Sequence, residues 1–555
     1  MENPARLKNL GYLERNALNG IVMVSTRPPR TYDLIVYGDE VPGVLALVSA
    51  SREYRRQTGK FLRTLLLVKS SAQLGIGGHL VRGGLAYLDR SNPPGDLRAK
   101  IGNATYGHPV AIYQEFIQQS GVVEIALDRK KADVALRKML TEVSADILSQ
   151  VSVTSAEVKD RNLSTITLSN GERYSAKSFI DCTVNAELAT AAQVRRYRGF
   201  ETFGLPNAEL PVTLVIETQG LTTQRLREVE LSYIQRLTNV NDAEAQRFIL
   251  IAAGSDQARA NQIRQSLLEI NGQPKRLHQG KDYIDVRCRA LSIMYHAFRG
   301  RRMDLEASGM LLDQGNIAVF PDGRMSWNAV MFLVNGEQAE AIARTGGKPT
   351  QAMLDEVPFL ERWFKSIGAT SITAMPELYV RHAGNVRDVV EPLTGAAMMA
   401  GGVPAAEALG TFAYHLDVRG GIPGLGRLAN GKGISNISFH YPPVFNIGIR
   451  HALLKNVRNL AVVSPASGFE GYACGAGRII EYNVGVGQGL GIAAAIAMNK
   501  NRNLADIGNW EVQEILESTK RLTRIYGVAH PTEVSRLKAF EVALCLPGDT
   551  GVAIA

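Results

Sequence analysis

Two glycines bracket a short turn that could bind a phosphate group. Gly38 follows the apolar run 32–37, and Gly43 precedes the apolar run 44–50. A buried strand that leads through a glycine turn into a helix exposes free N–H groups that can hold a pyrophosphate. Glu40 stands where such a turn usually has its middle glycine. Because a carboxylate repels a pyrophosphate, we expect Glu40 to turn aside toward a ribose hydroxyl. A tight strand-to-helix connection without any ligand is the alternative for this turn alone.

Lys69 follows the next predicted strand, residues 62–68, where dinucleotide-binding folds place an acidic residue for the ribose. A lysine cannot accept hydrogen bonds from ribose hydroxyls, but it can pair with a phosphate such as the 2′-phosphate of NADP. Lys69 is therefore compatible with a nicotinamide dinucleotide, and equally with a solvated strand end.

A second group of glycines could lie against a planar ligand. Gly77-Gly78 and Gly83-Gly84 form two pairs, and His79 directly follows the first pair. Glycine has no Cβ, so the backbone can approach a flat surface closely. Two such pairs are more than a loop requires, which favours a planar ligand.

These segments resemble the flavin-dependent oxidoreductases whose FAD domain is glutathione-reductase-like and also similar to that of fumarate reductases. The family's first strand and turn resemble residues 35–43, its flavin loop resembles 77–84, and its late internal strand resembles 180–183. The cofactor contacts that we expect in the first half of the chain are Gly38, Glu40, Gly43, Lys69, Gly77, Gly78, His79 and Thr183. Some fumarate-reductase relatives carry a histidyl-flavin bond, but the offset of His79 from the second glycine pair differs from theirs.

The carboxy-terminal half carries further matches to this family. Residues 376–381 are similar to its Pro-x-x-Tyr-x-Arg strand, 446–450 to the strand that brings an arginine toward the flavin, and 475–491 to its closing helix. By that resemblance, backbone N–H groups near Gly487, Gln488 and Gly489 face the flavin pyrimidine. A helix N-terminus there would stabilise the negative charge of a reduced flavin.

Three positions depart from the family pattern. Lys69 replaces the ribose acid, Val184 replaces a glycine, and Ser464-Pro465 stands where a glycine and a polar residue are usual. Each change removes a contact or narrows a close approach to the ligand. Weak or absent FAD binding therefore stays open as an alternative.

Three side chains are candidates for chemistry beside the flavin. Residues 411–417 alternate as in a strand, which places His415 and Asp417 on one face. We expect His415 or His440 to act as acid or base, and Arg450 to clamp an anionic substrate or the flavin. A structural histidine and a buried ion-pair arginine are the alternatives.

The predicted strands and helices that position these residues indicate an α/β fold. By the resemblance, it is an FAD/NAD(P)-binding Rossmann-like domain, discontinuous in sequence, with an inserted mixed α/β substrate domain. From about residue 205 the pattern of predicted elements changes. Longer polar helices such as 242–271 are expected there, mixed with strands such as 210–217. The predicted organisation is an N-terminal extension (1–30), the first segment of the FAD-binding domain (31–204), the substrate domain (205–390), the second segment of the FAD-binding domain (391–501) and a helical tail (502–555).

The composition narrows the class of protein. The 555 residues are 45% hydrophobic and 21% charged, which is typical of a globular chain. Four scattered cysteines and the lack of a His or Cys cluster argue against a metal site and favour a reducing compartment. The net charge of +9 is spread along the chain, which favours a small anionic ligand over nucleic acid. Neither a signal peptide nor an apolar span of about 20 residues is visible, so we expect a cytoplasmic protein without a membrane span.

The sequence thus predicts an FAD-dependent oxidoreductase that acts on a small organic molecule by hydride transfer to or from the flavin. Two alternatives remain. One is an NADP-linked reductase, because Lys69 could pair with the 2′-phosphate of NADP. The other is a cofactor-poor relative that serves as a binding or scaffold protein, because the three departures would weaken FAD binding.

Overall fold

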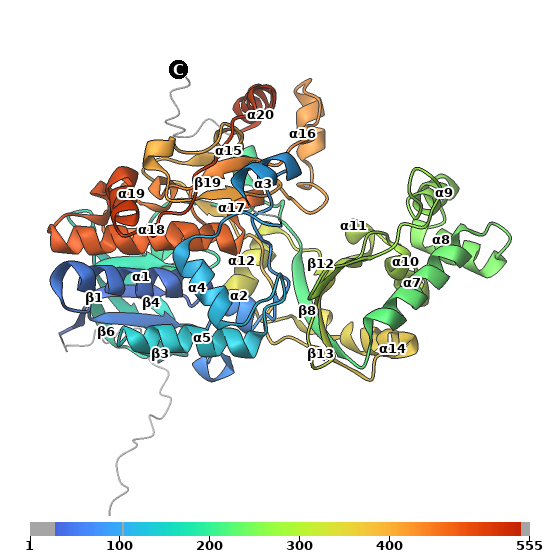
Figure 1. The fold of residues 1–555 in the computed structure, drawn as a ribbon, viewed down its shortest axis with the longest axis horizontal. Helices are drawn as coiled ribbons and strands as arrows, with labels where there is room; N and C mark the ends of the chain where they lie inside the picture. The colour runs from blue at the N-terminus through green and yellow to red at the C-terminus, as the bar shows by residue number, and fades with distance from the viewer. Residues whose placement is uncertain (1–27, 103–104, 546–555) are drawn as a thin grey trace, which may run out of the picture.

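The computed structural model describes residues 28–102 and 105–545, and it is a mixed α/β structure with two large sheets (Figure 1). The strands of the first sheet are β1 (Arg30–Tyr37), β2 (Thr64–Val68), β3 (Asp146–Ser149), β4 (Val153–Lys159), β5 (Asn162–Leu168), β6 (Arg173–Asp181) and β18 (Leu460–Val462). Their order is β3-β2-β1-β6-β5-β4, and β18 also pairs with β6. The pairs β1–β2, β1–β6, β2–β3 and β6–β18 are parallel, whereas β4–β5 and β5–β6 are antiparallel. The predicted strands near 32–37 and 62–68 are confirmed.

Both faces of the sheet are buried at its central strands β1 and β2, as their continuous apolar runs predict. Leu34 and Val36 of β1 pack into one core together with α1 (Val41–Thr58), α5 (Arg129–Glu142) and α18 (Ile480–Asn499). Ile35 and Tyr37 pack into a second core on the other face. The parallel strands β1, β2 and β6 point the same way, so the segments that follow them meet at one edge of the sheet.

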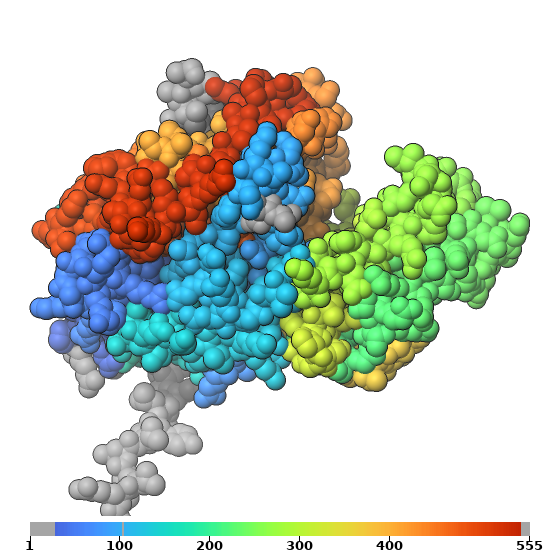
Figure 2. Space-filling model, in the orientation of Figure 1, coloured from blue at the N-terminus to red at the C-terminus, as the bar shows by residue number. Residues whose placement is uncertain are grey.

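The second sheet is antiparallel, in the order β13-β8-β12-β11-β10-β9. Its strands are β8 (Val212–Gln219), β9 (His278–Gln279), β10 (Tyr283–Asp285), β11 (Met310–Val319), β12 (Arg324–Phe332) and β13 (Ser371–Ala374). We call residues 212–374 the outer lobe. Its core includes side chains of α7 (Thr223–Thr238), α10 (Ala290–Phe298) and α14 (Val357–Ile367). Figure 2 shows that the lobe stands out from the rest of the molecule.

Three elements differ from the prediction. The expected helix 242–271 is two helices, α8 (Ala243–Ala253) and α9 (Gln257–Gln265), because Gly254 and Ser255 adopt positive φ values between them. The expected strand 411–417 ends early, as β16 (Thr411–Ala413), which pairs with β17 (Val444–Asn446). The closing helix α18 starts at Ile480, well before the predicted start at Gly487.

The remaining elements are short or peripheral. The further helices are α2 (Gly78–Val81), α3 (Gly95–Ile101), α4 (Ala111–Gln119), α6 (Glu187–Ala191), α11 (Leu305–Ser308), α12 (Gly336–Arg344), α13 (Gln351–Leu354), α15 (Gly395–Met399), α16 (Leu425–Gly431), α17 (Cys474–Gly477), α19 (Asn509–Ser518) and α20 (Pro531–Leu544). The further strands are β7 (Arg196–Tyr197), β14 (Asn385–Val386), β15 (Leu393–Thr394) and β19 (Phe469–Glu470). The predicted extension 1–30 lies almost wholly outside the described residues, as does the end of the predicted tail beyond 545. Within the described part of the chain, no helix has the length and apolar character needed to cross a membrane.

Candidate functional site

The turn between β1 and α1 packs tightly against the end of β6. Gly38 has a φ of +94°, and a Cβ added to it would lie 2.7 Å from the carbonyl carbon of Cys182. A Cβ added to Gly43 would lie 2.4 Å from the Cβ of Cys182. Both glycines are therefore needed for backbone packing, whether or not the turn holds a ligand.

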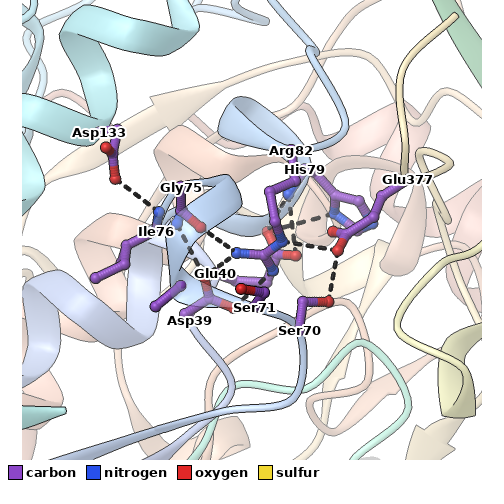
Figure 3. A network of polar contacts seen from close by, with 12 residues as sticks. Asp39, Glu40, Ser70, Ser71, Gly75, Ile76, His79, Arg82, Asp133 and Glu377 are labelled. Carbon is purple, nitrogen blue, oxygen red and sulfur yellow. Dashed lines mark hydrogen bonds and ion pairs between the residues drawn. The ribbon is translucent and has the colours of Figure 1, made fainter. Parts of the chain in front are cut away.

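The two acidic side chains of this turn bind backbone amides of the second glycine segment (Figure 3). Both carboxylate oxygens of Glu40 lie 3.1 Å from the His79 N–H, which donates to them, and the Gly77 N–H donates to Asp39 at 3.0 Å. A Cβ added to Gly78 would lie only 2.0 Å from Glu40 Oε1, so the glycine makes room for this carboxylate. The expectation that Glu40 turns toward a ribose position is corrected: it turns to the start of α2.

Arg82 joins three parts of the chain beneath this turn. Its guanidinium donates to Asp39 at 2.8 Å, to the Gly75 carbonyl at 2.7 Å and to Glu377 at 2.7 Å. Glu377 also accepts from the Ser70 hydroxyl at 2.5 Å. Burial opposes the ionisation of Asp39, but Arg82 and the nearby amides hold the pKa of Asp39 below its ordinary value. Asp39 and Arg82 thus form the charged centre of a buried ion-pair cluster.

The other predicted nucleotide contacts also have partners within the chain. Lys69 forms an ion pair with Glu187 and donates to the Ala343 carbonyl at 3.0 Å. The Thr183 hydroxyl donates to Asp181 at 2.7 Å and accepts from the Glu187 N–H at 2.8 Å. Gly38, Glu40, Lys69, His79 and Thr183 line one cavity of about 50 Å³. We call this cavity the narrow end.

A much larger cavity, of about 560 Å³, lies where the outer lobe meets the rest of the chain. We call it the wide end. It is lined by Tyr87, Leu88, Asp89, Arg90, Asn92, Arg98, Thr105, Tyr106, Ile125, Tyr283, Asp285, Asn316, Tyr414, His415, Asp417 and Arg419. His415, one of the two predicted acid/base residues, is an exposed member of this lining.

Two carboxyl groups of the wide end have shifted pKa values. Burial raises the pKa of Asp89, although Arg478 and Arg419 oppose this. Burial would also raise the pKa of Asp417, but Arg478 and Arg419 hold it below its ordinary value.

Buried arginines connect the two ends. Tyr379 packs edge-on against the His79 ring at the narrow end, with the ring centroids 5.3 Å apart. Its hydroxyl accepts from Arg478 at 2.7 Å, and Arg478 also donates to Asp417 of the wide end at 2.8 Å. A continuous set of side chains therefore runs from the β1–α1 turn to the large cavity. We call the two ends and this connection the groove.

Arg381 lies within this set and is the least satisfied of its charged groups. It is only 1% exposed, and its guanidinium stacks 4.7 Å from the centre of the Tyr379 ring. Its Nη1 donates to the Pro211 carbonyl at 2.6 Å, but Nε and Nη2 have no hydrogen-bond acceptor among the described residues. Burial, together with Arg419 and Arg478, lowers the pKa of Arg381 to about 9. A buried cation with open donors indicates a place for an anionic group.

Five predicted site residues lie outside this groove in the structure. Arg450 forms a half-exposed ion pair with Glu391 at 2.7 Å, so it is not a buried clamp. His440 is exposed in the stretch between α16 and β17. Gly487, Gln488 and Gly489 lie inside α18 rather than at its N-terminus, so their amides belong to the helix. A Cβ on Gly487 would lie 2.6 Å from the Pro42 carbonyl, which shows that this glycine serves the contact with α1.

Sequence reasoning missed Arg82, Arg381, Arg419 and Arg478 as site residues. The available signal was an arginine inside an apolar or glycine-rich stretch, as at Arg82 and Arg478, since a buried charge is costly unless it has a role. Most of their charged or buried partners lie tens to hundreds of positions away, as in the Arg82–Glu377, Arg381–Pro211 and Arg478–Asp417 contacts, so the sequence did not show which groups meet.

Comparison of this chain with known proteins identifies the protein family to which it is similar. The model of the family "FAD dependent oxidoreductase" matches residues 33–516. No curated protein matches the chain. The solved structures similar to it include the halogenase PltM, with 13% identity, 85% of this chain and 71% of that chain covered, and a TM-score of 0.34. They also include PqsL, a probable FAD-dependent monooxygenase from Pseudomonas aeruginosa, with 9% identity, 93% and 97% covered, and a TM-score of 0.33. Likenesses this low carry no weight for function.

The two ends of the groove differ in how they fit FAD. Ligand pockets usually hold about 300 Å³ or more, whereas the narrow end has about 50 Å³. The amides and cations there that a pyrophosphate would need already bind Asp39, Glu40, Glu377 and Glu187. As folded, these residues do not fit the pyrophosphate of FAD. The wide end has the volume, and two of its lining residues, Asp417 and Arg419, interact electrostatically with the buried Arg381.

Proposed function

The chain belongs to the family of FAD-dependent oxidoreductases, and from this premise we propose that it oxidises or reduces a small organic anion in the wide end. FAD is the cofactor of this family, and when bound it supplies the redox chemistry. The observation that carries the substrate class is Arg381, a buried guanidinium with two open donor atoms. A carboxylate or phosphate group would satisfy those donors with charge-assisted hydrogen bonds.

In this proposal His415 exchanges a proton with the substrate. It is an exposed histidine in the cavity lining, two residues from Asp417, and its ring can reach solvent. An imidazole exposed in a cavity lining can give a proton to a bound substrate or take one from it, which suits general acid or base catalysis. Arg478 and Arg419 hold the pKa of Asp417 low, so this carboxylate stays ionised beside it.

We also propose that the predicted domain organisation holds. In it, the first sheet belongs to a discontinuous, glutathione-reductase-like FAD domain (31–204 and 391–501), and residues 205–390 form the inserted substrate domain. The return of β18 to the sheet that β1 and β6 begin supports a discontinuous domain. The separate core of the outer lobe supports the insertion.

The test of the function uses the purified protein supplied with FAD, without oxygen. Small mono- and dicarboxylic acids, including hydroxy and amino acids, are added one at a time, each beside its neutral amide. We expect at least one acid to bleach the visible absorbance of the flavin, while its amide does not. Arg381→Met should abolish this bleaching without releasing FAD. Equal reactivity of acids and amides would refute the anionic substrate.

His415→Gln gives an independent check of the proton transfer. We expect the rate of bleaching at saturating acid to fall about 100-fold or more, in line with the usual contribution of an acid or base. Any pH dependence of this rate that comes from the proton transfer should disappear with it, while the dissociation constant of the acid stays the same. An unchanged pH profile would remove His415 from the mechanism.

A further inference from the structure

We propose that Glu40 competes from within the chain for the place of the cofactor's pyrophosphate, so that FAD binds only after this side chain has moved. The proposal rests on FAD being the cofactor of the proposed function. Glu40 stands directly before α1, an 18-residue helix whose N-terminus carries partial positive charge. Its carboxylate accepts from the His79 amide with both oxygens (Figure 3). The Glu40 side chain makes no capping hydrogen bond to α1, and its carboxylate is an anion that lines the cavity beside this turn.

The surroundings of Glu40 strengthen this competition. Asp39 and Glu377 add two carboxylates to the same cavity wall, and Arg82 is already paired with both of them. Lys69, the other cation of the wall, is paired with Glu187. Besides the Lys69–Glu187 pair, the wall thus holds three carboxylates and one guanidinium, so a pyrophosphate that enters the narrow end would meet an excess of negative charge.

Among these carboxylates, Glu40 has the side chain that can move most easily. Asp39 is buried and bound by Arg82 through both oxygens. Glu40 has a side chain that is 15% exposed, and its nearest cationic candidate is His79 Nδ1, at 3.4 Å. Rotating Glu40 outward frees the His79 amide and leaves the Asp39–Arg82–Glu377 cluster intact. The position that dinucleotide-binding turns fill with glycine therefore sets the cofactor affinity of this chain.

The test compares two ligands on three forms of the full chain. FAD carries the pyrophosphate, whereas riboflavin has the same ring and lacks every phosphate. Dissociation constants are measured by flavin fluorescence for the wild type, Glu40→Gly and Glu40→Gln. Glu391→Gln is the control, because it removes a carboxylate from an exposed ion pair outside the groove. We expect Glu40→Gly to bind FAD at least tenfold more tightly than the wild type and riboflavin with unchanged affinity. Glu40→Gln should lie between them, since it removes the charge and keeps an acceptor for the His79 amide.

Three results would overturn the proposal. They are equal FAD affinity in the wild type and Glu40→Gly, weaker binding by both Glu40 variants, or an equal gain for riboflavin and FAD. Thermal unfolding of each variant is recorded alongside, and Glu40→Gln supplies the comparison if the glycine variant is unstable. Because the readout is binding, a gain in FAD affinity stands even if no carboxylic acid proves to be a substrate. Conversely, turnover of an acid by the wild type does not rescue the proposal if Glu40→Gly leaves FAD affinity unchanged.

Discussion

Arg381 shows how a single buried charge links stability to binding. Removing a guanidinium from water costs several kcal/mol unless partners replace the lost hydration. Arg381 receives one hydrogen-bond acceptor, Pro211, and the face of Tyr379, while Arg419 and Arg478 add repulsion. The ligand-free fold therefore carries an electrostatic cost that a bound anion would relieve. Arg478, by contrast, is paired with Asp417 and with the Tyr379 hydroxyl.

These two arginines should respond in opposite ways to the same substitution. We expect Arg381→Met to keep or raise the free energy of unfolding of the ligand-free protein, by up to about 4 kcal/mol, because an uncompensated charge is replaced by an apolar chain. Arg478→Met should lower it by about 3 kcal/mol, because Asp417 then loses the closer of its two arginine partners and the Tyr379 hydroxyl loses its donor. Denaturant unfolding measures both. Equal destabilisation of the two variants would show that Arg381 is structural and would remove the anion site.

The contact between α1 and α18 illustrates an element whose glycines serve packing. A Cβ on Gly491 would lie 2.4 Å from the Ala46 carbonyl oxygen and 2.8 Å from the Ala50 N, both in α1. Together with Gly487, this residue lets two buried helices approach to backbone distance behind the β1–α1 turn. The glycine run read from the sequence as a flavin-binding helix start thus holds α1 in position instead.

Gly491→Ala tests this packing. Alanine favours a helix over glycine by about 1 kcal/mol, but here its Cβ would push the two helices apart. We expect a net loss of about 1–3 kcal/mol in the free energy of unfolding, as in overpacked cores. Gly431→Ala in α16 is the control, because a Cβ there meets no atom within 4 Å, and it should be neutral or slightly stabilising. If Gly491→Ala is as stable as the wild type, close helix packing is not the role of this residue.

At the scale of the whole molecule, the wide end lies at a polar junction between the outer lobe and the rest of the chain. Asp282 of the lobe accepts from the backbone N–H groups of residues 124, 125 and 126 at 2.9, 3.0 and 3.1 Å. Asp285 accepts from the Tyr87 hydroxyl at 2.6 Å, and the Ser326 hydroxyl donates to the Gly84 carbonyl at 3.1 Å. Polar junctions of this kind permit relative motion more readily than apolar ones. These hydrogen bonds therefore help to hold the walls of the wide end together.

Asp282→Ala should loosen this junction. We expect the amides of Glu124, Ile125 and Ala126 to exchange their hydrogens about tenfold faster or more, since hydrogen bonds to a charged group contribute about 1.5–3 kcal/mol. Exchange in β1 and β2 should stay unchanged. Asp242→Ala, which removes the cap of α8 elsewhere in the lobe, is the control. Unchanged exchange at residues 124–126 would show that other contacts hold the lobe.

The sequence by itself determined the local elements around the narrow end. The apolar run before Gly38, the helix after Gly43 and the strand ending at Val68 follow from periodicity and glycine placement, and the structure confirms them. It also placed His415 among the site candidates, although β16 ends two residues before it. Such patterns depend on neighbours within a few positions, which the sequence displays directly.

Only the tertiary structure decided which charges meet. The Glu40 carboxylate binds an amide 39 positions away, and the Arg82–Glu377 pair spans 295 positions. The same long-range packing buried Gly487 against α1 and left Arg450 near the surface. A charged or flexible side chain takes whichever partner the folded backbone brings within reach, and no local pattern encodes that choice. The family can be identified along the chain, but the partners of the charged groups around the β1–α1 turn are a property of the fold.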